Sequence, residues 1–491
     1  MKYKLLGFVM IAIILMASVM AYPAEIEEKK GRVHQHLTSR WEHGCDCDGS
    51  QLCTHLPLVM MDTYGQEIPG LPTGQTDILG HGIYSTTEDG SATITMGVSV
   101  IDNQETNNHP DDTPAFSTPC QVHIRGNSSR RFPKSSYSLV FVDNLGNSAD
   151  YEVMGMKAHH EWVLNGPILD KTLVRNYMWY NISGELMNYA PNARFCELIL
   201  NGEYRGVYLM VEGLTDDPGG RLNLSLRAKN KRGTGYLLRM DRPTEEDLET
   251  TRDIYSYNER MSNFGTDIAI RYPGKKTLTP ELAKDIELDY SAFERALFSY
   301  DYDTEAYGYW NWIDVNNFVD YYLINEFTHN ADAGKYSTYI YKEVGQKYRL
   351  CVWDFNNCCD NYQERESDIA GFGTVEQAWF FMLFKDEAFV EKVIDRYREL
   401  RESYLSDEYL MDYIDETLAY LGPALERNNE RWADEIAGWD ALVPAERNVH
   451  SHEEAVDQLK NWILARGAWL DEHIDALKFY GHPSKNKVYN H

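Results

Sequence analysis

The sequence predicts an α+β protein whose N-terminal half is rich in β-structure and whose C-terminal half is mainly helical. Two regions carry this prediction. Residues 56–142 contain short β-type runs between long loops of Gly, Asp, Asn, Thr and Pro, whereas from Thr279 apolar residues recur at helical spacing. A third region, residues 313–362, combines a predicted helix with a predicted hairpin and contains the most informative chemistry.

The composition excludes one class of partner. The chain of 491 residues has 47 Lys and Arg against 76 Asp and Glu, a formal net charge of −29. A chain this acidic repels phosphate backbones, so we expect no nucleic-acid partner. A phosphorylated ligand would need a local basic pocket or a cation.

The N-terminus has the pattern of an export signal. Lys2 and Lys4 precede an apolar run from Leu5 to Met20, and Ala21 offers a cleavage point. We therefore expect an exported protein at the cell surface or outside the cell. The alternative is an uncleaved signal anchor, which is the one membrane attachment that the sequence suggests.

Eight cysteines accompany this signal. They are Cys45, Cys47, Cys53, Cys120, Cys196, Cys351, Cys358 and Cys359. An even count in an exported protein permits disulfides, but eight cysteines allow about 105 pairings. The spacing of the first three does not match a common zinc module, which favours a local disulfide or free thiols over a metal.

Strands and one hairpin are predicted in the N-terminal half. The first four strands are Leu56–Met61, Ala92–Ile101, Cys120–Ile124 and Ser136–Val142. A helix is predicted over Asp170–Leu186. Asn201-Gly202 between two β-type runs is a strong hairpin signal, so Phe195–Leu200 is expected to pair with Tyr204–Glu212.

The pattern breaks at Glu212–Gly220, which we interpret as a hinge between two parts of the chain. The predicted organisation is a signal peptide at 1–21, a flexible lead-in at 22–55, a β-rich part at 56–215, a mainly helical part at 216–480 and a tail at 481–491. In the last part, helices are predicted at Asp386–Tyr404, Asp407–Leu421 and Ser451–Leu477.

A basic glycine turn, Arg125–Leu139, joins two predicted strands and reads RGNSSRRFPKSSYSL. Backbone N–H groups in such a turn can form an anion nest, and Lys134 can reach a phosphate from the start of the next strand. The alternative is an ordinary solvated basic loop. The turn is not a Walker loop, because it lacks GK[ST] running into a helix.

Residues 313–362 predict two converging carboxylates. Asp314 can cap a helix, and a hairpin of Ser337–Lys342 and Lys347–Trp353 follows a polar loop. A hairpin returns to its origin, so Asp332 before it and Asp354 after it are expected to face one point. This arrangement suits one carboxylate that orients a nucleophile and one that holds a metal. The alternative is a loop residue and an Asx turn.

Taken together, these segments resemble the CotH kinase family, the spore-coat-protein-H-like atypical protein kinases. The resemblance runs from about Leu56 to about Leu477. It rests on RGNSSRRFPKSSYSL (125–139), LNGPILDKTLVRN (164–176), ELILNGEYRGVYLMVE (197–212), NADAGKYSTYIYK (330–342) and VWDFNN (352–357). It implies a divergent bilobal protein-kinase-like fold that uses Mg²⁺ (or Mn²⁺) and ATP.

The resemblance also implies residue roles. Asp332 would be the catalytic residue that orients the substrate hydroxyl, Asp354 would ligate the metal, and Lys134 would bind the nucleotide phosphates. The other implied ATP-binding positions are Gly126, Asn127, Ser128 and Arg131. For the second metal ligand, Ser337 lies near the position of the usual Asn, with Asn357 or Asp360 as alternatives. Glu185 is a candidate partner for Lys134.

The expected function is therefore transfer of the γ-phosphoryl group of ATP to serine or threonine hydroxyls of protein partners. One alternative is a catalytically weak or inactive binding or adhesion protein on the same fold. Another is a glycoside hydrolase with Asp332 and Asp354 as acid and base, although that chemistry gives the basic glycine turn no role.

Overall fold

The computed structural model describes residues 32–38, 45–76, 82–225, 234–242, 253–254 and 266–486. From Val33 on, these residues belong to one compact unit. The predicted signal peptide, residues 1–21, lies outside the described residues. No helix within the described ranges is long and apolar enough to cross a membrane.

The β-rich N-terminal part forms a closed barrel of order β1-β10-β11-β9-β6-β5-β4. The strands are β1 (Leu58–Asp62), β4 (Ile94–Ile101), β5 (Phe116–Ile124), β6 (Tyr137–Phe141), β9 (Glu161–Asn165), β10 (Ala193–Leu200) and β11 (Glu203–Glu212). β1 closes the barrel because Leu58 is opposite both Glu197 of the parallel β10 and Ile101 of the antiparallel β4. The barrel has its own apolar core, which includes Val59, Met96, Val122, Leu139, Leu198 and Met210.

The predicted strands of this region are confirmed with shifts of a few residues. The predicted hairpin is β10–β11, and Asn201 and Gly202 both have positive φ, at 52° and 78°, as a tight two-residue turn requires. Two small strand pairs were not predicted. They are β2 (Pro72–Thr76) with β3 (Gly82–Tyr84), and β7 (Tyr151–Val153) with β8 (Met156–His159). β2 is largely exposed, so its sequence lacks the alternation of apolar and polar residues that predicts a strand.

A second, five-stranded sheet follows the barrel strands in sequence, and β11, the last of them, ends at Glu212. Its order is β13 (Asp253–Ile254), β14 (Asp267–Tyr272), β12 (Tyr236–Asp241), β15 (Thr338–Lys342) and β16 (Tyr348–Cys351). The predicted hairpin is β15–β16, with Tyr339 opposite Cys351. The C-terminal part is otherwise mainly helical, as predicted. β13 and β14 were not predicted, because they are short and are separated from their partners by long segments of sequence.

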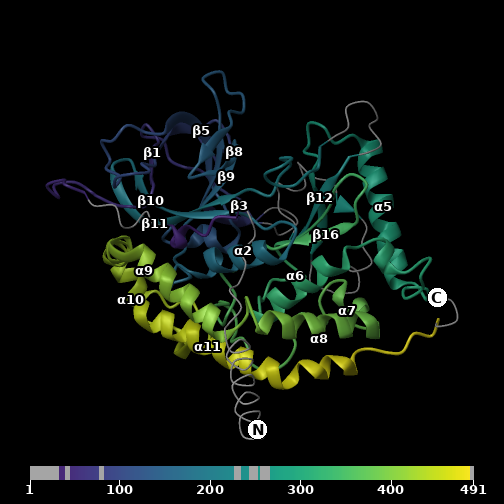
Figure 1. The fold of residues 1–491 in the computed structure, drawn as a ribbon. Coiled ribbons are helices and arrows are strands. Elements are labelled where there is room, and N and C mark those ends of the chain that lie inside the picture. The colour runs from purple at the N-terminus through teal and green to yellow at the C-terminus, as the bar shows by residue number, and fades with distance from the viewer. Residues whose placement is uncertain are drawn as a thin grey trace, which may run out of the picture. The chain divides into compact units, whose positions relative to one another are not determined.

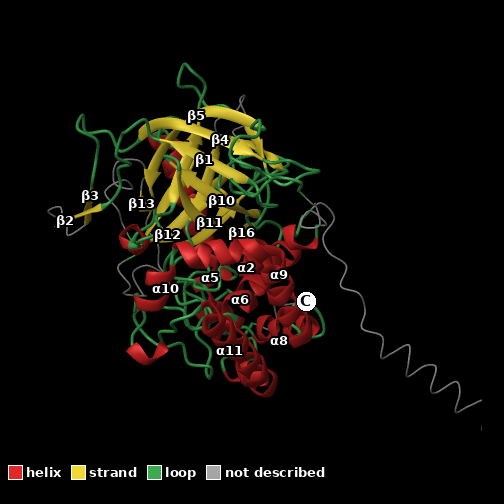
Figure 2. Ribbon diagram, turned by 90° about the vertical axis from the view of Figure 1, so that its left-hand side faces the viewer, coloured by secondary structure: helices red, strands yellow, loops and turns green. Residues whose placement is uncertain are grey.

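The remaining elements are helices, drawn in red in Figure 2. They are α2 (Arg175–Leu186), α5 (Pro280–Phe298), α6 (Val315–Phe327), α7 (Phe380–Leu383), α8 (Glu387–Arg401), α9 (Asp407–Arg431), α10 (Ala433–Gly438) and α11 (His452–His473). α9 lies under β11 of the barrel (Figure 1). It was predicted to end at Leu421. A kink at Gly422, with φ of 43°, interrupts the apolar period there, and the helix continues beyond it.

Helix α6 is buried on all sides rather than along one stripe. Every residue from Asn317 to Phe327 is buried, so its polar side chains need internal partners. Asn317 exchanges two hydrogen bonds with the backbone of Leu350, at 2.7 and 3.2 Å. Glu326 pairs with the buried Arg466 at 2.7 Å. The helix that leads to Asp332 is therefore fixed in position from several directions.

Part of the predicted flexible lead-in is ordered against the core. His34, Gln35 and His36 are buried. Gln35 accepts a hydrogen bond from the Phe195 N–H at 2.7 Å and donates one to the Phe195 carbonyl at 3.1 Å. The polar composition suggested a solvated segment, but these side chains satisfy buried backbone and tyrosine groups instead.

Candidate active site

Strand pairing brings three residues to one edge of the five-stranded sheet. Met240 of β12 is opposite Thr338 of β15, and Tyr339 of β15 is opposite Cys351 of β16. Because these strands alternate in direction, the end of β12, the start of β15 and the end of β16 share that edge. The residues at or just past these ends are Asp241, Ser337 and Asp354. Asp332 precedes β15 in the loop that leaves α6.

The loop after α6 fixes Asp332 through its backbone and one carboxylate oxygen. The Asp332 carbonyl accepts hydrogen bonds from the N–H groups of Lys335 and Tyr336 at 3.1 and 2.8 Å. Asn357 donates its Nδ2 to Oδ2 of Asp332 at 2.8 Å. Asp332 is 9% exposed, so its carboxylate lies in a site that is largely shielded from water. One carboxylate oxygen is thereby oriented by an amide from the segment after β16.

A chain of amides fixes Asp354. Asn356 donates its Nδ2 to Oδ1 of Asp354 at 2.7 Å, and Asn176 of α2 donates to Oδ1 of Asn356 at 2.9 Å. Asn176 also accepts the Phe355 N–H at 2.8 Å. The Asp354 N–H donates to the hydroxyl of Tyr180 at 3.0 Å. Helix α2 thus positions the segment that carries the second carboxylate.

Backbone strain gathers at the same place. Asp354 has φ of 58° and Ser337 has φ of 47°, a region that costs a non-glycine residue about 1–3 kcal/mol. His329, Cys359 and Asp360 nearby in the sequence also have positive φ. Such strain persists only where the surrounding contacts impose it, and it concentrates at functional sites.

The three carboxylates raise one another's pKa. Burial is the first cause for each of Asp241, Asp332 and Asp354. Repulsion adds to it: Asp354 raises the pKa of Asp332, Asp332 raises that of Asp241, and Asp241 raises that of Asp354. The site therefore carries more negative charge than it can hold easily, which favours a shared proton or a bound cation.

Four cations adjoin these carboxylates, and one of them, Arg239, lies 3.9 Å from Oδ2 of Asp241. The Arg125 guanidinium opposes the rise in the pKa of Asp354 and lies 5.6 Å from the centre of the Trp353 ring. Lys335 and Arg242 act in the same sense on Asp332. Arg242 stacks on the ring of Tyr336 at 3.5 Å. Arg125 is the first residue of the basic glycine turn, so this turn does reach the sheet edge.

Lys134, from the same turn, lies in a different environment. Its ammonium group is 1% exposed and donates to the Val207 carbonyl at 2.6 Å and to Oδ1 of Asn428 at 2.9 Å. Burial lowers its pKa well below the usual value, and the nearby charged groups that affect it belong to Cys196, Arg205 and Arg431. A phosphate contact by Lys134 requires a different side-chain position from this one.

The other predicted binding residues of the turn surround a short 3₁₀ turn, Ser128–Arg131. Gly126 has φ of 112°, and a Cβ there would lie 1.8 Å from Oγ of Ser129, so only glycine fits. Asn127, Ser128 and Arg131 are exposed. These residues are accessible to a ligand from solvent.

Comparison with known proteins decides the family. A model of the family described as CotH kinase protein matches residues 122–470. The chain belongs to the CotH kinase family. It is also 23% identical over 370 residues to the inner spore coat protein H of Bacillus subtilis (strain 168), a match that covers 72% of this chain and 87% of that protein.

The segment matched to the CotH family contains the basic glycine turn, α2, α6 and all three carboxylates. The predicted alternatives for a second metal ligand differ in their availability. Asn357 donates its Nδ2 to Asp332, which leaves its amide oxygen as a potential ligand. Asp360 instead pairs with Arg447 at 2.8 Å. The Ser337 N–H donates to Asp241. Glu185 pairs with His34 at 3.0 Å.

Three residues of this CotH site escaped the sequence prediction. Asp241 directly follows the β-type run Tyr236–Met240, but its role depends on the pairing of β12 with β15, about 100 residues away in the sequence. Arg125 was included only as the start of the turn. Asn356 was noted only as part of the VWDFNN segment. A search for polar residues immediately after each predicted strand would have selected Asp241 and Arg125.

The residues present fit a divalent cation with oxygen ligands. The carboxylate oxygens of Asp241, Asp332 and Asp354 do not all lie within 4.8 Å of one another, as judged over the described residues. Mg²⁺ in phosphoryl-transfer sites needs only one or two carboxylates, because water and phosphate oxygens supply the rest. Asp354 offers one such carboxylate, and Asn357, whose Nδ2 bonds to Asp332, keeps an amide oxygen that could add a ligand.

Proposed function

We propose that this member of the CotH family is an ATP-dependent protein kinase that transfers the γ-phosphoryl group to serine or threonine hydroxyls of protein substrates. The observation that carries the proposal is the meeting of Asp332 and Asp354 at one sheet edge, each oriented by an asparagine amide. The family's description as kinase protein supports it. The barrel and the helical part would act as two lobes of a divergent kinase-like fold.

Asp332 would act on the substrate hydroxyl. Asn357 occupies its Oδ2, so Oδ1 is the oxygen that can accept the hydroxyl proton. Its raised pKa makes it a stronger base than an ordinary aspartate. Asp332 accepts this proton as the hydroxyl oxygen bonds to the γ-phosphorus, and the bond from that phosphorus to the bridging oxygen breaks to release ADP.

Asp354 would hold Mg²⁺ or Mn²⁺, with Asn357 and Ser337 as candidates for a further ligand. The bound ion would neutralise charge on the nucleotide phosphates. Arg125, which adjoins Asp354, would contact the same phosphates, together with Gly126, Asn127, Ser128 and Arg131 in the accessible turn beside it. Lys134 would join them only by leaving its two buried acceptors.

We further propose that the protein is exported and acts at the cell surface or outside the cell. The pattern of residues 1–21 supports export, and the name of the Bacillus subtilis relative, an inner spore coat protein, supports a location in a surface layer. The partner would be a protein with target serines. The alternative function is a catalytically weak or inactive binding protein on the same fold.

The test is phosphate transfer from γ-labelled ATP with Mg²⁺ to an added protein substrate and to the chain itself. Asp332→Asn and Asp354→Asn are expected to abolish transfer, and Asp368→Asn serves as the matched control because Asp368 is an exposed loop aspartate. Transfer that is unchanged in Asp354→Asn would refute the metal assignment. No transfer by the unmodified chain, together with no rise of its Tm on addition of Mg–ATP, would favour the binding protein.

A further inference from the structure

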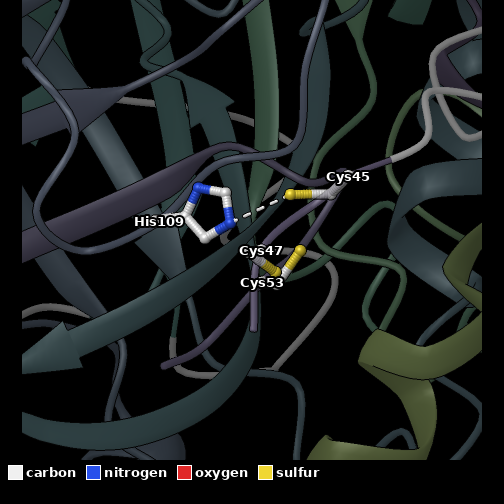
Figure 3. Close-up of side chains that lie close together, drawn as sticks. All are labelled: Cys45, Cys47, Cys53 and His109. Atoms are coloured by element: carbon white, nitrogen blue, oxygen red, sulfur yellow. Dashed lines mark hydrogen bonds between the residues drawn. The ribbon is translucent and has the colours of Figure 1, made fainter. Parts of the chain in front are cut away.

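A second cluster of reactive side chains lies apart from the carboxylate site. The ligand atoms of Cys45, Cys47, Cys53 and His109 all lie within 4.8 Å of one another (Figure 3). Sγ of Cys45 is 3.3 Å from Nε2 of His109. The two exposed cysteines, Cys45 and Cys47, and the half-buried Cys53 and His109 leave the cluster open to solvent on one side.

The fold brings these four residues together. Leu58 of β1 is opposite Ile101 of the antiparallel β4, so the chain before β1 and the chain after β4 leave the barrel at the same end. There Thr54 and Asn108 form a β-bridge, with N–H···O distances of 3.1 and 2.7 Å. Cys53 and His109 each neighbour a bridging residue in sequence. The bridge therefore fixes one cysteine beside the histidine.

A set of polar contacts around the cluster orients its ligand atoms. Oδ2 of Asp112 accepts a hydrogen bond from the backbone N–H of His109 at 2.9 Å. The same oxygen lies 3.3 Å from Nδ1 of the His109 imidazole ring. Asn103 donates to that carboxylate oxygen at 2.8 Å. A proton on Nδ1 leaves the lone pair of Nε2 directed at the sulfurs. Such carboxylate–histidine pairs are a recurrent support of metal-bound imidazole.

The sulfurs also receive donors. Asn107 donates its Nδ2 to Sγ of Cys53 at 3.1 Å. Cys47 lies within hydrogen-bonding reach of His109 and of the Gly49 N–H. Gly49 has φ of 72°, a conformation that turns the chain back toward Cys47. These donors help to fix the sulfurs of Cys47 and Cys53 within the cluster.

We propose that Cys45, Cys47, Cys53 and His109 bind one Zn²⁺ ion as a closed structural site of three thiolates and one imidazole. Three sulfurs and one nitrogen are a donor set that zinc takes in tetrahedral sites. On binding, the three thiols release their protons to solvent and the ion takes the sulfur lone pairs, with no change of oxidation state. A disulfide would use two sulfurs and would leave the third thiol, His109 and Asp112 without a role.

The zinc proposal goes beyond the expectation of a local disulfide or free thiols, since the structure itself shows all three cysteines as free thiols. The short spacing of the three cysteines matched no common zinc module, and the fourth ligand comes 56 positions after Cys53. It also lies outside residues 122–470, the segment matched by the CotH family. Zinc would link the segment before β1 to the loop between β4 and β5. The ion would therefore stabilise one end of the barrel, with no part in phosphoryl transfer.

The test is the zinc content of the full-length chain, purified under reducing conditions and measured by elemental analysis. One zinc per chain is expected. Cys47→Ser and His109→Ala are expected to lose it. His160→Ala is the matched control, because His160 also pairs through Nδ1 with an aspartate, Asp150 at 2.7 Å, but lies outside the thiol cluster. Zinc content that is unchanged in Cys47→Ser and His109→Ala would overturn the proposal.

A milder variant guards against misfolding of the ligand variants. Asp112→Asn keeps all four ligands and should weaken zinc affinity by roughly 10–100-fold in a competition with a chelator, while leaving a stoichiometric site at excess zinc. Cobalt substitution should give the intense visible absorption of tetrahedral thiolate coordination. An absence of this absorption, or a disulfide among the three cysteines in the zinc-treated reduced protein, would refute the site.

Discussion

Asp332 and Asp354 are buried, so the negative charge of each carboxylate raises the free energy of the folded state. Both are held by amides, and burial is the first cause of the raised pKa of each. Repulsion from Asp354 raises the pKa of Asp332 further, and repulsion from Asp241 acts in the same sense on Asp354. An asparagine at either position would remove this cost, so the charge brings no gain in stability. The free-energy cost of the charged pair is therefore evidence that the pair is used.

This cost predicts a gain in stability when Asp332 is replaced. Asp332→Asn keeps an acceptor for Asn357 and removes the charge, so the free energy of unfolding at pH 7 without Mg²⁺ should rise by roughly 0.5–2 kcal/mol. Because burial raises the pKa of Asp332 in the folded state, the unfolded chain loses this proton at a lower pH than the folded chain does. The free energy of unfolding of the wild type therefore falls as the pH rises from about 3.8, the ordinary pKa, to the higher pKa of folded Asp332. The gain should vanish at and below the unfolded pKa.

Urea unfolding at several pH values, from pH 3 upward, measures this effect. Asp368→Asn, at an exposed loop position, should change stability by less than about 0.5 kcal/mol at each pH. A wild type that is as stable as Asp332→Asn at pH 7 would mean that the carboxylate is solvated and carries no burial cost.

Arg125 and Lys134 come from one turn, but we expect replacement of Arg125 to affect ATP binding and replacement of Lys134 to affect stability. Arg125→Ala should raise the KM for ATP at least about tenfold with little change in Tm, because its guanidinium faces the carboxylate site. Lys134→Met should lower Tm, because Val207 and Asn428 lose a buried donor, at a cost of about 1–3 kcal/mol. Measured KM and Tm separate the two. A large KM effect of Lys134→Met at unchanged Tm would restore its predicted role as phosphate ligand.

At the scale of elements, local signals were readable and distant pairing was not. The cap at Asp314, the hairpin β15–β16 and the Asn201-Gly202 turn each lie within about 20 residues of sequence, and all are confirmed. In the second sheet, β12 pairs with β14 and β15, from which long segments of sequence separate it. For that reason the sequence pointed to Asp332 and Asp354, which flank one local hairpin, and not to Asp241 at the end of β12.

Helix α2 is the element that links the barrel to the carboxylates. Asn176 bonds with both the Phe355 N–H and the Asn356 amide, and its Nδ2 also lies 3.4 Å from Oδ1 of Asn165 at the end of β9. Asn176→Ala should leave Asp354 poorly positioned. We expect the Mg²⁺ concentration for half-maximal transfer to rise about tenfold or more, while Asn147→Ala, at an exposed barrel turn, leaves it unchanged. An unchanged Mg²⁺ requirement in Asn176→Ala would show that α2 does not orient the side chain of Asp354 for the proposed metal site.

At the scale of the whole molecule, the segment around His36 links the N-terminal residues to α2 and α9. Its Nδ1 lies 2.9 Å from the hydroxyl of Tyr177, and its ring is 4.3 Å from that of Tyr413. Burial, and then repulsion from His34, lower the pKa of His36 to about 3. The polar composition of this segment did not predict that His36 packs against the core, because its partners Tyr177 and Tyr413 lie 141 and 377 positions away in the sequence.

The docked histidine predicts a loss of stability in mild acid. Below pH 6.5 the unfolded chain binds a proton that folded His36 rejects, so stability falls as pH drops toward 3, by at most about 1.4 kcal/mol per pH unit. Glu416 faces the ring at 3.9 Å and would moderate the loss. His36→Phe should flatten this dependence between pH 7 and 5 in urea unfolding. Equal slopes in both proteins would place His36 in solvent.

The central claim is that Asp332 and Asp354 have different tasks at one sheet edge. The most direct test is the rate of phosphate transfer by Asp332→Asn at an Mg–ATP concentration that saturates its binding. We expect that Mg–ATP still raises the Tm of this variant while its transfer rate falls by roughly 10²-fold or more. Transfer at the wild-type rate by a variant that binds Mg–ATP normally would show that Asp332 does not act on the substrate hydroxyl.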